Sequence, residues 1–498
     1  VVDMSTVKIT GIGGRQISVH TGLFINNEFV PAQDNATVKT ENPFNGKVLA
    51  DISAAQASDV DKAVAAAEKA FNGTWKLTQP TVRRDLMNRL ADLIERDNEE
   101  LASLESVDAG ILFRESSGMF VPQAVETLRY YAGWADKVDG QSLHIPQGIS
   151  YSRRVPIGVC AAIVPWNAPL MITMWKLAAA LATGNVLIIK TPEASPLYGQ
   201  KLGQLIVEAG FPPGVVSILC GLGIVAGSAL SAHPAIRKLS FTGSPGVGRQ
   251  ILAASAKTNL KKISLELGGK GPSIVFDDAD FENALQWTAA GITVNNGQIC
   301  AAGSRIYVHA DIYDKFVKAF SERTKDSVAG DPLLQETTKG PVINAGQKKR
   351  VMEYIKIGQD EKVKVLHGAD DSKLPTEGHF VPNTAFVDVD PQATVIREEI
   401  FGPVACIAKF STEEEVVRLA NDSSYGLGSA VFTKDINKAI RVSEELESGQ
   451  VTINMWGVVN ANVSFGGFKE SGFGRDCGKE AIDDWTQAKY ISVMVPKL

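Results

Sequence analysis

Short apolar runs alternate with helix-like segments between residues 158 and 243. The run GVCAAIVPW (158–166) precedes the helix-like LMITMWKLAAALATG, and the strand-like NVLIIK (185–190) follows it. The alternation continues through VVSIL (215–219) and IRKLSFTG (236–243). Strand, helix and strand in succession predict an α/β fold with a doubly wound parallel sheet, whose ligands bind beyond the carboxyl ends of the strands.

A second alternating region follows the turn GGKGP (268–272), with PSIVF, FENALQWTAAGITV, RIYVH and DIYDKFVKAFSERTK in that order. A chain of 498 residues exceeds what one hydrophobic core usually organises, so a second α/β unit is expected here. The N-terminal segments 58–71 and 81–106 have the pattern of amphipathic helices. We expect them to cover the first unit and to contribute no separate site.

Charge and composition narrow the class of partner. The 50 Lys and Arg and 56 Asp and Glu give a net charge of -6 without a basic run, which argues against nucleic-acid binding. The most apolar stretch, 170–189, is interrupted by Lys176, Gly184 and Asn185, so no membrane span is expected. A small molecule is the predicted ligand.

The cysteines and histidines do not form a metal or disulfide pattern. Five cysteines lie far apart without a C-x-x-C pair, and six histidines show no H-E-x-x-H. We therefore expect no metal and a reducing compartment. The start VVDMSTVKIT lacks the features of a secretory signal, so the cytoplasm is expected, with the mitochondrial matrix as the alternative.

Three residues are candidates for chemistry. Cys300 lies in NNGQICAAGSR, where turn-forming and small neighbours leave access to a nucleophilic sulfur, whereas Cys160, Cys220 and Cys406 lie in apolar runs typical of a core. Glu266, in SLELGGKGP, has apolar neighbours that would raise its pKa toward that of a general base; an exposed strand-end glutamate is the alternative.

The third candidate is Asn167 in VPWNAPL, at a corner where a strand ends. Its carboxamide could stabilise an oxyanion or simply cap a turn. The turn FTGSPGVG (241–248) follows a strand and opens a helix, as a phosphate-binding turn requires. KTPE (190–193) ends another strand with a lysine and a glutamate, which could hold ribose hydroxyls or form a structural ion pair.

The motifs PWNAP, LATGN, KTPE, FTGS, LELGGK, GQIC and EEIFGP (398–403) occur in this order over nearly the whole chain. In this order and spacing, the chain resembles the hydrolytic, non-acylating branch of the NAD(P)-dependent aldehyde dehydrogenase superfamily. The resemblance implies that Cys300 is the nucleophile, Glu266 the general base and Asn167 the oxyanion-binding side chain. It further implies that Lys176 and Asp476 relay protons.

The resemblance also implies a cofactor site. Its expected residues are Trp166, Lys190, Glu193, Gly243, Ser244, Glu399 and Phe401. A carboxylate at Glu193 accepts hydrogen bonds from a free ribose 2'-hydroxyl and repels a 2'-phosphate, so NAD is expected as the cofactor and NADP as a weaker substitute.

The expected substrate tunnel has small residues, Ala168 and Val459, at positions where the family often has aromatic ones. Its other expected residues are Met171, Trp175, Trp456 and Phe465. A wide apolar tunnel predicts broad specificity that includes bulky or aromatic aldehydes. Two alternatives stay open: a semialdehyde dehydrogenase for a charged metabolite, disfavoured because 168–175 and 455–465 contain no arginine, and a noncatalytic relative.

The resemblance implies a Rossmann-type cofactor domain, an α/β catalytic domain and a small β oligomerisation domain. We expect the NAD-binding domain at 1–132 and 153–267 and the catalytic domain at 268–474. The oligomerisation domain is expected at 133–152 and 475–498. A homotetramer is the expected assembly.

Overall fold

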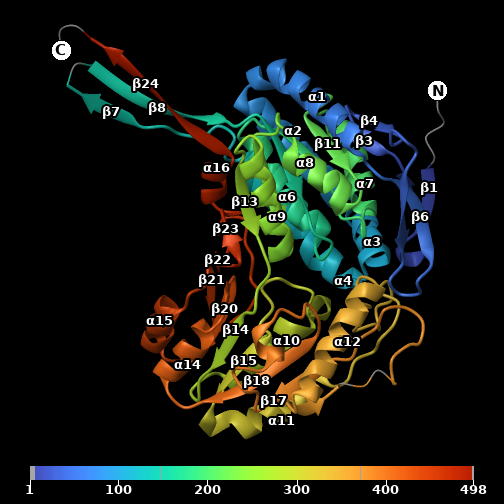
Figure 1. Cartoon of the computed structure of the whole chain (residues 1–498), viewed down its shortest axis with the longest axis vertical. Coiled ribbons are helices and arrows are strands. Elements are labelled where there is room, and N and C mark those ends of the chain that lie inside the picture. Colours follow the sequence, from blue (N-terminus) through green and yellow to red (C-terminus); the bar gives the residue numbers. More distant parts are fainter. Residues whose placement is uncertain (1–5, 147, 369, 371, 496–498) are drawn as a thin grey trace.

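The computed structural model describes residues 6–146, 148–368, 370 and 372–495. Two α/β domains lie one above the other, and a long β arm projects from the upper one (Figure 1). Within the described part of the chain, no helix combines the length and the apolar composition that a membrane crossing requires.

The upper domain is built on an eight-stranded sheet. Its strands are, in spatial order, β23 (Gly472–Phe473), β13 (Lys262–Glu266), β12 (Lys238–Thr242), β9 (Val159–Ile163), β10 (Val186–Lys190), β11 (Val216–Leu219), β3 (Leu23–Ile25) and β4 (Glu28–Val30). The middle five are parallel, as the alternating pattern predicted, and the edge strands are antiparallel. The chain leaves β9 in one direction and later returns to its other side with β12, so a ligand crevice is expected between the carboxyl ends of these two strands.

Two layers of helices surround this sheet. Those that contact the strands are α1 (Ala57–Asn72), α6 (Pro169–Ala182), α7 (Leu197–Ala209) and α9 (Pro245–Lys257). An outer layer of α2 (Pro80–Arg96), α3 (Asn98–Ala109) and α5 (Val121–Ala132) packs on α6 and α7. The segment 81–106, for which the sequence predicted amphipathic helix, contains two helices, α2 and α3, that meet at Asp97. The Asp97 carboxylate binds Lys201 and Arg96.

Helix α6 begins beside the crevice and is buried along its whole length. Pro169 occupies its first turn, where a proline lacks no needed N–H. Glu105, on α3, accepts a hydrogen bond from the Leu170 amide at 3.0 Å. A buried carboxylate therefore fixes the helix end that carries Asn167 toward the crevice.

The lower domain contains a seven-stranded sheet. Its strands are, in spatial order, β16 (Lys364–His367), β17 (Thr384–Val387), β18 (Val404–Phe410), β15 (Arg305–His309), β14 (Pro272–Val275), β20 (Gly428–Phe432) and β21 (Gln450–Ile453). All but β16 are parallel, which confirms the expected second α/β unit. Its longer helices are α10 (Phe281–Thr293), α11 (Tyr313–Thr324), α12 (Ala345–Asp360), α14 (Glu413–Asn421) and α15 (Ile436–Glu445).

The remaining elements are short or lie at the periphery. They are β1 (Thr6–Thr10), β2 (Gln16–His20), β5 (Thr37–Glu41), β6 (Val48–Ser53), β19 (Tyr425–Gly426), β22 (Phe468–Lys469), α4 (Phe113–Glu115), α8 (Ser228–Ala232), α13 (Thr394–Arg397) and α16 (Glu480–Asp484).

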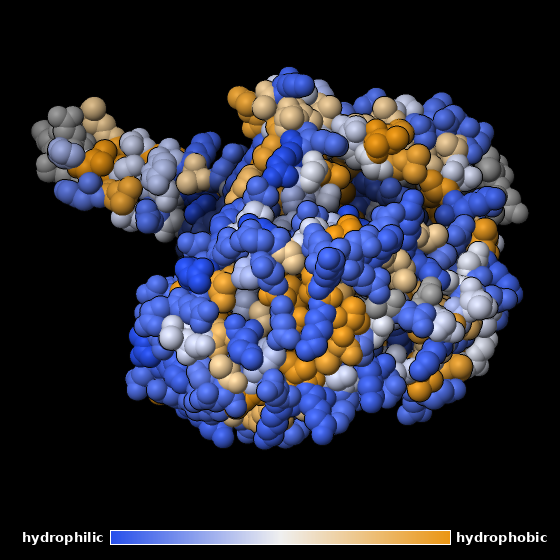
Figure 2. Space-filling view, turned by 60° about the horizontal axis from the view of Figure 1, so that its bottom comes forward, coloured by the Kyte–Doolittle hydropathy of each residue, from blue (hydrophilic) through white to orange (hydrophobic). Residues whose placement is uncertain are grey.

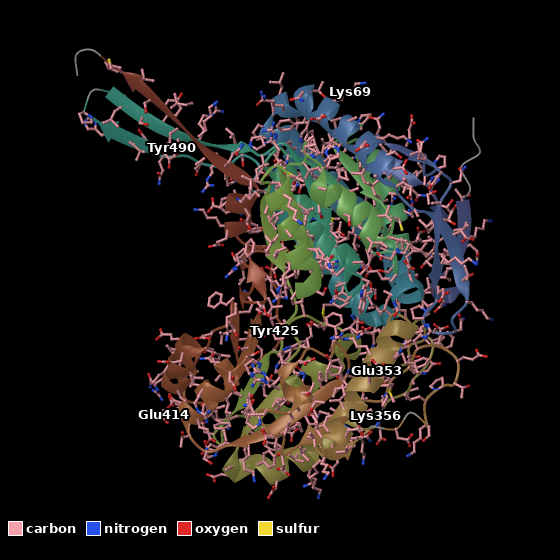
Figure 3. All side chains as sticks on the ribbon, in the orientation of Figure 1. Lys69, Glu353, Lys356, Glu414, Tyr425 and Tyr490 are labelled. Atoms are coloured by element: carbon pink, nitrogen blue, oxygen red, sulfur yellow. The ribbon has the colours of Figure 1, made fainter. Side chains whose placement is uncertain are left out.

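The arm consists of β7 (Ser142–Ile145), β8 (Gly148–Pro156) and β24 (Thr486–Met494), all antiparallel. It stands clear of the body with apolar and polar side chains mixed on its surface (Figure 2), and Tyr490 lies on it (Figure 3). We propose the expected three-part division with narrower edges for the arm, because residues of α16 and Trp485 pack in the core of the upper domain.

Candidate active site

Cys300 lies on the loop that joins α10 to β15, close to the junction of the two domains. The loop opens with a turn, Val294–Gly297, in which Asn295 and Asn296 adopt left-handed φ angles of 46° and 54°. Two consecutive non-glycine residues in this region are uncommon and need outside support. The chain thus places its half-buried cysteine on a tightly specified turn.

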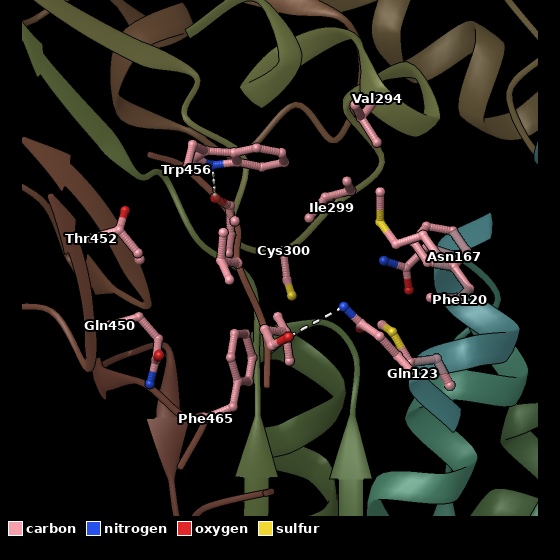
Figure 4. Close-up of a pocket in the computed structure, with 18 of the residues that line it drawn as sticks. Phe120, Gln123, Asn167, Val294, Ile299, Cys300, Gln450, Thr452, Trp456 and Phe465 are labelled. Atoms are coloured by element: carbon pink, nitrogen blue, oxygen red, sulfur yellow. Dashed lines mark hydrogen bonds between the residues drawn. The ribbon is translucent and has the colours of Figure 1, made fainter. Parts of the chain in front are cut away.

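Two cavities meet at this cysteine. One encloses about 280 Å³ and is lined mainly by apolar side chains; the other, a cleft of about 320 Å³, runs between the domains. Cys300 and Asn167 line both, and Figure 4 shows the two side chains facing the apolar cavity. A molecule in either cavity can therefore approach the same sulfur.

Asn167 is held by the loop that carries Cys300. Its Nδ2 donates a hydrogen bond to the Gln298 carbonyl oxygen at 2.9 Å, and its own carbonyl oxygen accepts one from Asn295 at 2.7 Å. An amide nitrogen has two hydrogens, so one remains for a ligand oxygen near Cys300.

Glu266 ends β13 and lines the cleft between the domains. Only 5% of it is exposed, and neither carboxylate oxygen has a hydrogen-bond partner among the described residues. Burial, with a further contribution from the negative charge of Asp476, raises the pKa of Glu266 well above its usual range. A carboxylate in this state can accept a proton near neutral pH.

A buried ion pair lies behind Glu266. Lys176 Nζ is 2.7 Å from Asp476 Oδ2 and 3.0 Å from Ser240 Oγ, and none of the Lys176 side chain is exposed. Both charges act on the pKa of Glu266, in opposite directions. The structure therefore groups three of the residues that the sequence proposed for proton transfer.

The thiol of Cys300 is protonated at neutral pH in the free protein. Burial, with further contributions from the carboxylates of Glu266 and Glu399, raises its pKa to about 12. Attack by this sulfur therefore has to be coupled to loss of the proton.

The two glycines of LELGGK allow the backbone of the site to pack closely. A Cβ on Gly268 would overlap the Glu399 carboxylate, and one on Gly269 would overlap the Cys300 carbonyl oxygen. The Gly269 amide donates to Glu399 Oε1 at 2.9 Å. Residues from three distant segments therefore meet without a side chain between them.

An aromatic pair closes one side of the cleft. The rings of Trp166 and Phe401 pack edge to face, with centroids 5.3 Å apart. Gly243 and Ser244 line the cleft at the start of α9, and Tyr425 lies near the junction of the domains (Figure 3). Five of the seven expected cofactor residues thus border one cleft.

Comparison with known proteins places these features in a family. A family model described as the aldehyde dehydrogenase family matches residues 29–491. An aldehyde dehydrogenase of Emericella nidulans is 47% identical over 94% of each chain. The chain belongs to the aldehyde dehydrogenase family.

Solved structures of aldehyde dehydrogenases share the fold of this chain. An NAD+ complex of a Bacillus cereus aldehyde dehydrogenase superposes with a TM-score of 0.94 at 41% identity, covering 95% of this chain and 96% of that one. A P. syringae indole-3-acetaldehyde dehydrogenase, solved with NAD+ and IAA, gives the same score at 36% identity over 96% and 97%. Both neighbours share the fold of this chain, and both were solved with NAD+.

All six expected tunnel residues of the enzyme line the apolar cavity. Trp456 is fixed by a 2.9 Å hydrogen bond from its Nε1 to the Ala301 carbonyl oxygen, and the rings of Trp175 and Phe465 lie 5.1 Å apart. No charged side chain of the described residues lines this cavity.

The two remaining cofactor residues form an ion pair at the end of β10. Lys190 Nζ lies 2.8 Å from Glu193 Oε2, and the Glu193 side chain is 42% exposed. Burial opposes ionisation of Glu193, but Lys190 outweighs it and the pKa of Glu193 is lowered. An ionised carboxylate therefore lies beyond the carboxyl end of β10.

Sequence reasoning missed some residues of the aldehyde dehydrogenase site. Phe120 and Gln123 line the tunnel from the helical segment 116–132, for which the sequence predicted no role in the site. Gln347 and Arg350, on α12, line the cleft and donate hydrogen bonds to the carbonyls of Phe401 and Glu399. An amphipathic helix gives no signal of which polar residue turns toward a site.

Proposed function

We propose that this enzyme oxidises bulky, largely apolar or aromatic aldehydes to carboxylic acids through a covalent intermediate on Cys300. The observation that carries the proposal is the position of Cys300 and Asn167 at the meeting point of an uncharged apolar cavity and the cleft. An aldehyde in the first can present its carbonyl carbon to the sulfur, while a cofactor in the second faces the same atom.

The residues of the cleft fit NAD. Thr242 Oγ1 is buried without a hydrogen-bond partner among the described residues, and Gly246 has open space around it at the start of α9. Ser244 and Gly243 would hold the pyrophosphate, Glu399 and Phe401 the nicotinamide side, and Lys190 with Glu193 the adenosine ribose. Bound NAD supplies the hydride acceptor that the oxidation needs.

The chain's own residues perform the rest of the reaction. The Cys300 thiol gives its proton to water, and the sulfur adds to the aldehyde carbon. The carbonyl electron pair moves onto oxygen, to which Asn167 donates a hydrogen bond. Loss of a hydride leaves a thioester on Cys300. Glu266 removes a proton from water as the water oxygen attacks the thioester. The carbon–sulfur bond then breaks, the acid is released, and the departing thiolate takes up a proton to restore the thiol.

A charged semialdehyde is a poorer match than an apolar substrate. The cavity offers no cationic side chain among its lining residues to offset the desolvation of a substrate carboxylate. The P. syringae neighbour is named for an aromatic aldehyde, which supports substrates of this class for the present enzyme.

Replacing Ala168 with phenylalanine tests the substrate class. Ala168 is buried at the start of α6 and lines the cavity, so a ring there would occupy substrate space. We expect kcat/KM for an aromatic aldehyde to fall by about tenfold or more while that for acetaldehyde changes little. NADH formation with short, long and aromatic aldehydes measures both; a wild-type enzyme that prefers acetaldehyde over every bulky aldehyde contradicts the proposal.

Replacing Glu193 with glutamine tests cofactor preference. The change removes the charge that repels a 2'-phosphate and frees Lys190 to bind it, so we expect the NADP to NAD ratio of kcat/KM to rise roughly fivefold, equivalent to about 1 kcal/mol. Glu208→Gln, an exposed glutamate on α7, is the matched control. A ratio that stays at the wild-type value contradicts the role of Glu193.

We propose that the arm joins copies of the enzyme into a homotetramer in a reducing compartment such as the cytoplasm. Exposed apolar residues on it, Leu143, Ile149, Tyr490, Val493 and Met494, suit burial against a second copy. All five cysteines are free thiols, as expected where disulfides do not form.

A further inference from the structure

Lys339 is a buried lysine outside both cavities. Only 4% of the residue is exposed, and no carboxylate of the described residues pairs with it. Burial lowers the pKa of Lys339 to about 7. A lysine in such a position is costly for a folded chain, so its contacts have to offset the cost.

Its ammonium group makes two hydrogen bonds. Nζ donates to Asn296 Oδ1 at 2.8 Å and to Asn383 Oδ1 at 2.6 Å. Asn296 is one of the two left-handed asparagines of the turn before Cys300. Lys339 is thus bonded to the strained part of the nucleophile loop.

The segment that begins at Lys339 is joined to that loop at further points. Asn296 Nδ2 donates to the carbonyls of Gly340 and Pro341 at 2.9 and 3.2 Å. The Ile343 amide donates to Gln298 Oε1 at 3.0 Å. Residues 339–343 therefore follow the turn 295–298 side by side, with hydrogen bonds at both ends.

The hydrogen bonds between 339–343 and 295–298 connect Lys339 to the reacting groups. The Gln298 carbonyl accepts the hydrogen bond from Asn167, and the Asn295 side chain donates to the Asn167 carbonyl. Cys300 follows two residues after Gln298. A shift of the turn would therefore displace the nucleophile and its oxyanion donor together.

We propose that Lys339 is a positioning residue for the reaction, which holds the left-handed turn so that Cys300 and Asn167 keep their mutual geometry. The inference rests on the proposed function of Cys300 as nucleophile. Lys339 lines neither cavity, so it acts through Asn296 and contacts neither substrate nor cofactor.

The test compares Lys339→Met, which removes the donor, with Lys339→Gln, which keeps an N–H donor on a chain one bond shorter. We expect kcat of the methionine variant to fall on the order of 10- to 100-fold, since small misplacements of reacting groups have effects of this size. KM for NAD should stay near wild type, and the rate of Cys300 alkylation by iodoacetamide should change. The glutamine variant should recover most of the wild-type kcat and most of the wild-type alkylation rate. Lys349→Met, an exposed lysine on α12, is the matched control.

A second variant tests the same contact from the other side. Asn296→Gly removes the acceptor while glycine tolerates the left-handed φ. We expect it to lose at least as much kcat as Lys339→Met, because it also removes the hydrogen bonds from Asn296 to the Gly340 and Pro341 carbonyls. The double variant should lose less than the two single losses combined, because both changes remove the shared Lys339–Asn296 contact.

The results distinguish a failure of the role proposed for Lys339 from a failure of the proposed function of the enzyme. Methionine and glutamine variants with wild-type kcat and wild-type alkylation rates would overturn the role of Lys339. An equal kcat loss in both, with unchanged alkylation, would also overturn it. A wild-type enzyme without turnover on any aldehyde would instead contradict the proposed function, and the alkylation rates would still decide whether Lys339 positions the thiol.

Discussion

Changing Cys300 to alanine is expected to lower aldehyde turnover by about 10⁴-fold or more, because removing a covalent nucleophile removes the only route through a thioester. The cleft should still bind NAD, since the other side chains that border it are unchanged. Steady-state NADH formation measures the first effect, and titration of NAD against the enzyme's tryptophan fluorescence measures the second.

Cys220→Ala is the matched control for this change. Cys220 is buried in a separate hydrophobic cluster beyond the end of β11, where burial raises its pKa to about 12. It contacts neither cavity, so its loss should leave kcat close to wild type and cost only some stability. If Cys300→Ala retained turnover within about tenfold of wild type, covalent catalysis by this sulfur would be disproved.

The parts of the enzyme that sequence alone predicted are those that local pattern determines. The alternation from 158 to 243 indicates that each strand is buried on both faces, and four parallel strands, β9 to β12, lie there. Cys300 could be singled out because the polar turn and small residues around it differ from the apolar runs around Cys160, Cys220 and Cys406. Such signals are carried by neighbours along the chain.

The parts that sequence did not predict depend on contacts between distant segments. Arg350 holds Glu399 across 49 residues, and Lys339 reaches Asn296 across 43. Asp97, between α2 and α3, likewise pairs with the distant Lys201. A single sequence does not show which residues pair in these contacts, because the contacts exist only once the sheets have brought the segments together.

Changing Glu266 to glutamine is expected to separate the two halves of the reaction. Glutamine keeps the shape of the side chain but has no proton-accepting carboxylate, so hydrolysis of the thioester should slow and steady-state kcat should fall about 10³-fold. Oxidation precedes hydrolysis, so each active site should release one NADH in a rapid burst. Rapid-mixing absorbance at the NADH band measures the burst and the slow phase.

The charges around Cys300 favour a burst of NADH formation in the Glu266→Gln variant. The Glu266 carboxylate raises the pKa of Cys300, so a neutral glutamine should make the thiol easier to deprotonate. Glu353→Gln, on the exposed face of α12, is the matched control and should turn over like wild type. Loss of the burst along with the steady state would mean that Glu266 acts before the thioester forms, contrary to the role proposed for it.

The pH dependence provides an independent check on Glu266. Burial and Asp476 raise the pKa of this carboxyl group, and only its deprotonated form can accept a proton from water. Wild-type kcat should therefore be low at acidic pH and rise as pH passes upward through the raised pKa. The glutamine variant should lack this rise, because it has no group to titrate at that position. If the glutamine variant kept the rise of kcat with pH, that rise would belong to another base. The buried Lys176–Asp476 pair behind Glu266 would then be the next group to test.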